Sequence, residues 1–220
     1  MRHTPAYLLT DEDEVKRLIS ENPWATIVSN TSNGLVASHY PVLLEEHPST
    51  SSGTGSSGAG GSGTDITIVS HVGRPDERLH ELGEHEVLVI IQGAHGYISP
   101  GWYDNDDFVP TWNHATAHLY GTPEILGDEE NFRVLGELVD HFEQRMPEPK
   151  SLQLDETSAR HIATGTVGIR IRVTRFDARL KLSQNETPEV VQRIIDALEA
   201  DGPYSSQPLA DEMRHARGAQ

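Results

Sequence analysis

Cysteine is absent from this chain of 220 residues. Its absence excludes a disulfide framework, a thiolate nucleophile and any zinc or iron–sulfur site with cysteine ligands. Long hydrophobic runs are absent as well, and none approaches the roughly 18 apolar residues of a membrane helix. The first residues, up to the acidic cluster that begins at Asp11, contain no apolar segment of the kind that a secretory signal needs. The sequence therefore predicts a soluble cytoplasmic protein without membrane contact.

Basic residues are few, because 17 Lys and Arg stand against 34 Asp and Glu and the net charge is −17. Affinity for DNA is built largely on basic side chains that neutralise phosphates, so direct DNA binding is doubtful. The most basic stretch holds Arg170, Arg172, Arg175 and Arg179. We interpret it as a long strand whose charges lie in water.

The pattern of apolar residues predicts a mainly β fold with peripheral helices, in which residues 1–220 form a single domain. Strands are expected over residues 24–30, 35–44, 65–71, 86–93, 96–103, 111–126 and 165–182. Helices are expected over residues 10–22, 75–84, 128–146 and 187–200, and a weaker one over 207–220. Residues 187–220 would form a C-terminal helical appendage. Because strands do not alternate regularly with helices, an antiparallel barrel with helices outside is favoured over a doubly wound sheet.

Residues 49–63 are of low complexity, since twelve of these fifteen are Gly or Ser. Such a run buries too little apolar surface to offset the entropy lost on ordering. The strand pattern resumes directly afterwards. We therefore expect a flexible loop between two strands, not a domain boundary.

Motifs for common chemistries are missing. The chain has no GxSxG, Walker or GxGxxG sequence. His114 and His118 are four residues apart, but in a strand this step spans roughly 13 Å, which is too far for two ligands of one metal ion. No metal site is predicted.

Aromatic and amide side chains cluster in two neighbouring stretches, Gln92 to Tyr103 and Val109 to His114, and a later stretch holds Lys181, Ser183 and Gln184. Aromatic rings offer flat faces, and amides offer paired donors and acceptors that match the edge of a heterocycle. Lys181, Arg74 and serine hydroxyls are suited to a phosphate. The combination favours a flat, phosphorylated ring such as FMN. The alternative is that the aromatics belong to a core or an interface.

Six motifs together resemble the PaiB family of FMN-binding split-barrel proteins, whose members are described as negative transcriptional regulators. The motifs keep their order along the chain: Val36-Ala-Ser-His39-Tyr-Pro41, Ser70-His71-Val-Gly-Arg74, Gln92-Gly-Ala-His-Gly-Tyr-Ile-Ser-Pro-Gly-Trp-Tyr103, Val109-Pro-Thr-Trp-Asn113, His118-Leu-Tyr-Gly121 and Lys181-Leu-Ser-Gln-Asn185. Directly after Arg74 the sequence departs from the Asn-Pro-Gln-Trp that is usual in the family, since it reads Pro75-Asp-Glu-Arg.

The resemblance implies an FMN-binding split β-barrel that forms a homodimer, with FMN at the subunit interface. Three groups of residues are then expected at the cofactor. The first, near the phosphate and ribityl chain, comprises Ser38, His39, His71 and Arg74. The second, near the isoalloxazine ring, comprises Gln92, Tyr97 and Ser99, and the resemblance allows Trp112 and Asn113 to join it from the second subunit. The third matches the family's late motif and comprises Lys181, Ser183 and Gln184.

The function that follows is FMN binding, and the flavin would supply redox chemistry if the protein is an enzyme. No residue stands out as a catalytic acid or base, and His71 and Tyr97 are only weak candidates for proton donors. Two alternatives stay open. One is a haem-binding or haem-degrading split barrel, and the other is a regulator without a cofactor that acts through a protein partner.

Overall fold

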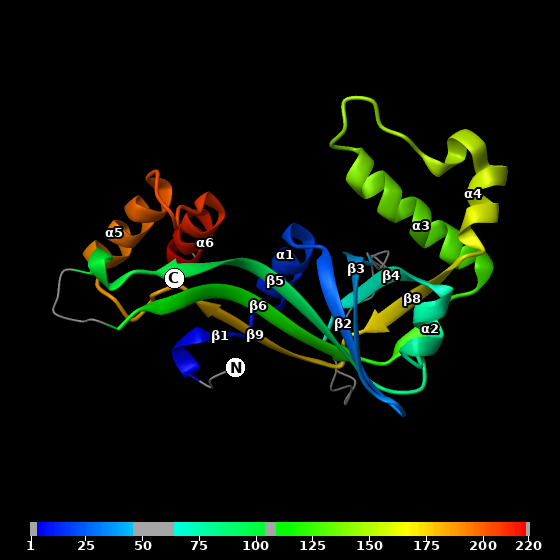
Figure 1. Cartoon of the computed structure of the whole chain (residues 1–220), viewed down its shortest axis with the longest axis horizontal. Helices are drawn as coiled ribbons and strands as arrows, with labels where there is room; N and C mark the ends of the chain where they lie inside the picture. Colours follow the sequence, from blue (N-terminus) through cyan, green and yellow to red (C-terminus); the bar gives the residue numbers. More distant parts are fainter. Residues whose placement is uncertain (1–3, 46–63, 104–108, 219–220) are drawn as a thin grey trace, which may run out of the picture. The chain divides into compact units, whose positions relative to one another are not determined.

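The computed structural model describes residues 4–45, 64–103 and 109–218 (Figure 1). The predicted Gly/Ser loop 49–63 and the acidic residues 104–107 lie outside the described residues. The chain divides into two compact units. Unit 1 comprises Met1–Leu18, Gln92–Ala117 and Asp177–Gln220, and unit 2 comprises Ile19–Ile91 and His118–Phe176. The single-domain organisation of residues 1–220 stays a prediction.

Unit 2 is built on antiparallel strands in the order β5-β2-β3-β4-β8-β7. Their bounds are β2 Trp24–Thr31, β3 Gly34–Leu44, β4 Thr67–Gly73, β5 Val87–Ile98, β7 Pro123–Ile125 and β8 Thr166–Arg172, and β5 continues into unit 1. The turn at Ser32 and Asn33 joins β2 to β3 as a hairpin, and Gly34, which follows the turn, has a positive φ of 108°. The β2–β3 hairpin (blue in Figure 1) contains the two strands expected over residues 24–30 and 35–44.

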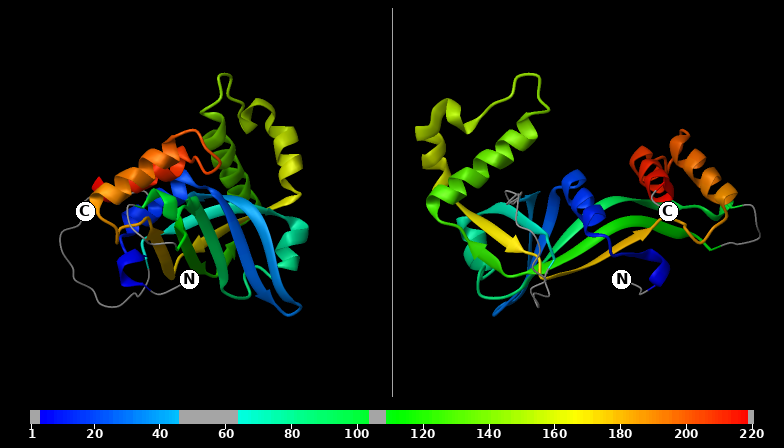
Figure 2. Two further views of the ribbon diagram at one scale, coloured as in Figure 1. Left: turned by 60° about the vertical axis from the view of Figure 1, so that its left-hand side comes forward. Right: turned by 180° about the vertical axis from the view of Figure 1, so that it is seen from behind.

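Helices α2 (Arg74–Leu79), α3 (Asp128–Glu143) and α4 (Glu156–Ala163) also belong to unit 2, together with the short 3-10 helix η3 (Leu152–Asp155). Helix α3 packs on β4 and β8 (Figure 2). Val134 and Leu138 on this helix are buried together with Val69. The close approach requires a glycine on β8, because a Cβ atom at Gly168 would lie 2.9 Å from the Cα of Asn131.

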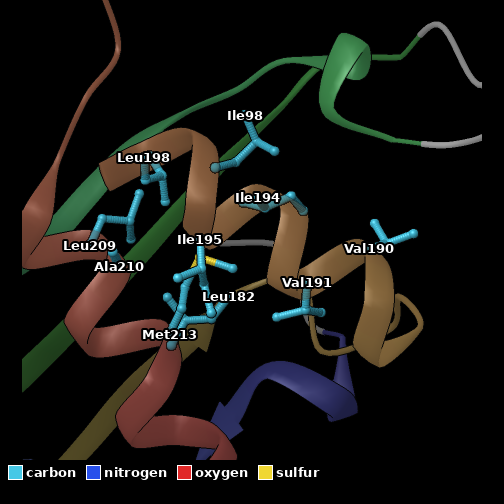
Figure 3. Close-up of a cluster of buried hydrophobic side chains, with 10 residues drawn as sticks. All are labelled: Ile98, Leu182, Val190, Val191, Ile194, Ile195, Leu198, Leu209, Ala210 and Met213. Carbon is cyan, nitrogen blue, oxygen red and sulfur yellow. The ribbon is translucent and has the colours of Figure 1, made fainter. Parts of the chain in front are cut away.

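Unit 1 has the strand order β1-β9-β6-β5, formed by β1 (Leu8–Leu9), β9 (Arg175–Lys181), β6 (Thr111–Gly121) and the second half of β5. Most of α1 (Glu12–Glu21) and the 3-10 helices η1 (Pro5–Tyr7) and η2 (Pro100–Trp102) belong here. Helices α5 (Pro188–Glu199) and α6 (Gln207–Gly218) enclose an apolar core, drawn in Figure 3. Its buried residues are Ile98, Leu182, Val190, Val191, Ile194, Ile195, Leu198, Leu209, Ala210 and Met213.

The helices expected from the sequence are confirmed, and no end differs by more than five residues. Helix α5 begins as predicted, with the Thr187 side chain accepting from the Val190 amide. Helix α6 was expected to be weak, but the side chains of Leu209 and Met213 are buried and anchor it in the apolar core. Helix α4 was missed, because Ile162 is the one large apolar residue among its eight residues.

Three strand predictions are wrong in their bounds. Residues 165–182 form two strands, since the backbone leaves the pattern at Val173 and Thr174, where the Thr174 amide donates to Tyr120. Residues 111–126 likewise divide into β6 and β7. Residues 96–98 continue β5, and η2 follows because Ser99 accepts from the Gly101 amide after Pro100. Within the described residues, no helix is long and apolar enough to cross a membrane.

Candidate functional site

The first group of predicted residues lies in unit 2, where Ser38 on β3 is at the centre of a hydrogen-bonded chain. The Ser38 hydroxyl donates to Oδ2 of Asp76 at 3.0 Å, and the Tyr40 hydroxyl donates to the same oxygen at 2.6 Å. Tyr40 in turn accepts from the Gly73 amide at 3.1 Å. Burial, and then the hydrogen bond to Asp76, raise the pKa of Tyr40, so its hydroxyl keeps its proton.

His80 extends this chain into the core. Its Nε2 lies 3.0 Å from the Ser38 hydroxyl, and its Nδ1 lies 2.8 Å from the hydroxyl of Ser29 on β2. Only 1% of His80 is exposed, and burial lowers its pKa, against the opposing effect of Asp76. Neither Asp76 nor His80 was predicted from the sequence, because their polar surroundings in the sequence resemble those of a solvated helix.

His71 and Arg74 occupy the next turn of the chain, on β4 and at the start of α2. The His71 ring meets the Tyr40 ring edge-on, with centres 6.1 Å apart. Its Nδ1 is buried without a hydrogen-bond partner in the described part of the chain, and burial lowers its pKa. The Arg74 side chain is directed elsewhere, since its Nε donates to the Thr164 carbonyl and its guanidinium lies 4.0 Å from Asp128.

His39 is exposed on the opposite face of β3. Its ring stacks on Trp24 of β2, with centres 6.3 Å apart and planes at 19°. Residues on this side alternate with buried ones on β2 and with half-buried ones on β3, as a strand requires. Ser38 and His39, which are neighbours in the sequence, are therefore presented to different surroundings.

The second group lies in unit 1, where Trp112 of β6 is the centre of an aromatic cluster. Its ring is 52% exposed and stacks on His95, with centres 6.0 Å apart and planes at 25°. Tyr97 meets Trp112 edge-on at 6.4 Å, and Tyr204 lies 4.8 Å from Tyr97. Gln92 is exposed on β5. We call His95, Tyr97, Trp112 and Tyr204 the aromatic cluster.

A change of phase in β5 explains why His95 and Tyr97 lie beside Trp112. Odd-numbered residues of β5 are buried up to Gly93, whereas Ile98 is buried and His95 is exposed further along. One extra residue in a strand produces such a shift. It turns the side chains that follow onto the face from which the Trp112 ring projects.

Lys181 of β9 is close to Trp112 and is half-buried. Its ammonium donates to the hydroxyl of Thr111 and, at 3.1 Å, to the carbonyl of Trp112, and it lies 5.9 Å from the centre of the Tyr7 ring. Burial lowers the pKa of Lys181. Burial, and then the charge of Lys181, also lower the pKa of His114, whose Nδ1 lies 3.1 Å from the Thr116 hydroxyl.

The other predicted residues of unit 1 direct their polar atoms at neighbouring protein atoms. Asn113 is buried on the core side of β6 and donates to the Ser183 hydroxyl at 2.9 Å. Gln184 accepts from the Leu182 amide at 2.6 Å and so closes the turn between β9 and α5. The Ser99 hydroxyl caps η2. Contact of these four residues with a ligand stays a prediction.

The basic stretch meets the expectation that its charges lie in water only in part, because Arg172 and Arg175 are exposed whereas Arg170 and Arg179 are buried. Only 1% of Arg179 is exposed, and Arg170 is buried in unit 2. Arg170 donates to both carboxylate oxygens of Glu45, at 2.6 and 2.8 Å, and to Glu130. These contacts balance its charge internally, so Arg170 does not contribute to a basic surface.

Comparison with known proteins defines first the class and then the family. The fold is that of the flavin-binding split barrels. A solved FAD and haem binding protein of Mycobacterium smegmatis matches with a TM-score of 0.55 at 15% identity, covering 84% of this chain and 78% of that one. The flavocytochrome Anf3 of Azotobacter vinelandii matches with a TM-score of 0.56 at 10% identity, covering 96% and 77%.

The chain belongs to the family described as "Putative FMN-binding domain", whose model matches residues 1–175. The "Protease synthase and sporulation protein PAI 2" of Bacillus subtilis is 28% identical over 217 residues, which are 96% of each chain. The family inferred from the six motifs is thereby confirmed, and so is the split-barrel fold.

The residues present fit a flavin. The unpartnered Nδ1 of His71 is a buried polar atom that a ligand can satisfy. The half-exposed Trp112 ring and the exposed Gln92 offer a flat face and an amide edge, which match a planar heterocycle with polar atoms at its rim.

Proposed function

We propose that this protein binds FMN, that it does so as a homodimer with the cofactor at the subunit interface, and that the bound flavin takes part in redox chemistry. The aromatic cluster of unit 1 carries the proposal. Exposed aromatic rings that are clustered leave apolar surface in contact with water, and surface of this kind marks a site that a ligand or a partner covers. The family description supports FMN among the flavins.

Within unit 1, Trp112 and Tyr97 would line the isoalloxazine ring, and Gln92 would meet its polar edge. Lys181 would hold the Trp112 backbone in place through the bond to its carbonyl. Within unit 2, Ser38, His71 and Arg74 would meet the rest of the cofactor, and His39 is placed instead on the exposed face of the hairpin. When bound, the flavin supplies the capacity to accept and donate electrons, and these side chains supply binding and orientation.

A sheet face in unit 2 that is apolar at most positions supports the dimer. The outward residues of three adjacent strands form it, and the polar Thr26, Asn30 and His39 lie among them. We call its apolar members the hairpin face: Trp24, Val28, Leu35, Ala37, Leu88 and Ile90. Trp24 is 63% exposed and Leu35 is 78% exposed. Exposed apolar patches of this kind mark interaction sites, and a second copy of the chain would bury them.

A regulatory role, if the protein has one, would run through a partner or through turnover of a small molecule. The net charge of −17 disfavours contact with DNA phosphates, and Arg170 and Arg179 add no basic surface. A gel shift with a steep salt dependence would contradict this reading.

The test of the proposed function is an absorption spectrum of the purified protein after incubation with FMN and desalting. Retained flavin absorption, with one FMN for each chain, is expected. Trp112→Ala should lose most of the flavin, and the matched control Phe142→Ala, at an exposed aromatic residue of α3 outside the cluster, should retain it. Bleaching by NADH or NADPH would establish redox activity. A protein that retains no flavin but gains a Soret band with haem would refute the proposal in favour of a haem protein.

A further inference from the structure

Asp76 introduces a negative charge among the residues expected to meet the phosphate and ribityl chain. It stands on α2, two residues after Arg74, and its Oδ2 accepts from both Ser38 and Tyr40. We call Ser38, Tyr40 and Asp76 the acceptor corner, because of the direction of the hydrogen bonds that they make.

Those directions follow from Asp76 alone. A carboxylate only accepts, so the single proton of the Ser38 hydroxyl is given to it. Ser38 must then accept from His80, which therefore carries its proton on Nε2. The unprotonated Nδ1 of His80 accepts from Ser29. One assignment of protons thus satisfies the whole chain from Ser29 to Asp76.

No side-chain hydrogen-bond donor remains in the acceptor corner. The protons of Ser38 and Tyr40 are both given to Asp76. Two backbone amides beside it are also engaged, since the Gly73 amide donates to Tyr40 and the Arg74 amide donates to the Gly165 carbonyl. Pro75 follows and has no amide proton.

Acceptors, in contrast, remain available. The Ser38 oxygen keeps one lone pair, and Oδ1 of Asp76 accepts no bond from the described residues. The Nε of Arg74 donates to the Thr164 carbonyl, and its guanidinium lies 4.0 Å from Asp128. A phosphate is itself an acceptor and carries negative charge, so the three side chains of the corner offer it repulsion and no proton.

We infer that the acceptor corner binds a neutral group that donates hydrogen bonds, such as the hydroxyls of a polyol chain, and excludes a phosphate. The inference rests on the proposed function and deepens it. For a flavin, the corner receives ribityl hydroxyls, the phosphate adds little to affinity, and Asp76 sets this selectivity.

The experiment compares the affinities of the full chain for three flavins, by titration with fluorescence detection. Lumiflavin has no ribityl chain, riboflavin has the chain without phosphate, and FMN has both. We expect riboflavin and FMN to bind within about threefold of each other and lumiflavin to bind at least about tenfold more weakly. Asp76→Asn, which keeps the side-chain shape and removes the charge, should raise the preference for FMN over riboflavin roughly tenfold. Glu77→Gln is the matched control on the same helix, and it should leave the preference unchanged.

Salt dependence tests the same point on the unaltered protein. A phosphate held by cations binds more weakly as ionic strength rises, whereas a phosphate repelled by Asp76 binds equally well or better. Nitrogen NMR of His80 without any ligand provides a further readout, and the Nε2–H tautomer is expected. The Nδ1–H tautomer would overturn the proton assignment and the inference with it.

The outcomes separate the inference from the proposed function. Strong preference of the unaltered protein for FMN, lost on adding salt, would overturn the inference and leave flavin binding intact. Equal binding of lumiflavin and riboflavin would also overturn it. Failure of all three flavins to bind would refute the proposed function itself, and the inference would fall with it.

Discussion

Trp112 donates a hydrogen bond from its indole Nε1 to Nδ1 of His95 at 3.3 Å, while the two rings are stacked. A neutral imidazole that accepts at Nδ1 carries its proton on Nε2. The exposed His95 therefore presents a donor of defined direction at the edge of the aromatic cluster.

This pair gives a prediction for flavin binding. Trp112→Phe keeps an aromatic face but removes the indole proton, so His95 loses its fixed tautomer. We expect FMN affinity to fall about three- to tenfold, compared with at least about tenfold for Trp112→Ala. Titration with FMN measures the affinities, and nitrogen NMR reports the tautomer of His95. An unchanged affinity of the Ala variant would exclude Trp112 from the site.

The sequence predicts only a part of the aromatic cluster. Trp112 and Tyr97 are recognisable from residue type and motif, as is Gln92 on β5. His95 and Tyr204 are not, because the phase change of β5 and the α5–α6 connection bring them in, and neither leaves a periodic signal. Asp76 and His80 were missed for a related reason. A short polar segment is interpreted as solvated, because its contacts with β2 and β3 leave no signal in the local sequence.

The contact between Glu45 and Arg170 predicts acid sensitivity in unit 2. The hydrogen bond from Arg170 is the main cause that holds the pKa of Glu45 below its usual range, although burial opposes it. A carboxyl group whose pKa is lower in the folded state stabilises above its unfolded pKa, and this stability is lost as the pH falls through the folded value. Between about pH 5 and 3, the free energy of unfolding should drop by on the order of 1 kcal/mol from this group, after allowance for solvent screening.

Urea unfolding at a series of pH values measures this contribution. Glu45→Gln should flatten the dependence below pH ~5, the region in which glutamate titrates. Glu137→Gln is the control, because Glu137 is an exposed glutamate that pairs with Arg133. The unfolding free energy of this variant should depend on pH as that of the unaltered protein does. Identical slopes for all three proteins would contradict the prediction.

His80 predicts a second pH effect, nearer neutrality. Burial lowers the pKa of His80 in the folded state. As the pH falls, the His80 imidazole of the unfolded chain therefore binds a proton before that of the folded chain does. Stability is therefore present above the unfolded value of about 6.5 and is lost as the pH falls, by up to about 1.4 kcal/mol for each pH unit. His80→Gln should reduce the slope of the unfolding free energy between pH ~6.5 and 5 by up to one proton. His71 and His114 contribute in the same direction, so a part of the slope should persist.

Two glycines of unit 2 should respond oppositely to alanine. A Cβ atom at Gly121, the last residue of β6, would lie 2.5 Å from the backbone carbonyl oxygen of Arg172. Gly121→Ala should destabilise by about 1–3 kcal/mol, because two backbones must separate. At Gly136 in α3 nothing lies within 4 Å, so Gly136→Ala should stabilise the helix by about 0.5–1 kcal/mol. Thermal and urea unfolding of both variants measure the difference. An unchanged free energy of unfolding for Gly121→Ala would contradict the prediction and show that β6 and β8 separate at little cost.

The strand boundaries show what local pattern cannot supply. Residues 165–182 alternate almost without interruption, yet β8 pairs with β4 and β7, whereas β9 pairs with β1. The break at Thr174 is made by its bonds to Tyr120, which is 54 residues away in the sequence. Alternation identifies a strand, but the choice of partners decides where it ends.

The hairpin face predicts how the oligomer depends on Trp24. If a second copy covers this face, the unaltered protein is a dimer at micromolar concentration. Trp24→Asp replaces the exposed indole ring of this face by a charged carboxylate. The loss of a buried aromatic anchor at an interface costs about 2–4 kcal/mol, so the dimer should weaken at least about 30-fold. Leu154→Asp, at a similarly exposed apolar residue of η3, is the control and should remain dimeric.

Light scattering gives the mass of each variant, and a parallel FMN titration relates dimerisation to cofactor binding. Flavin affinity should fall together with dimerisation if the cofactor lies at the subunit interface. A monomeric Trp24→Asp variant that binds FMN with unchanged affinity would place the flavin within a single subunit.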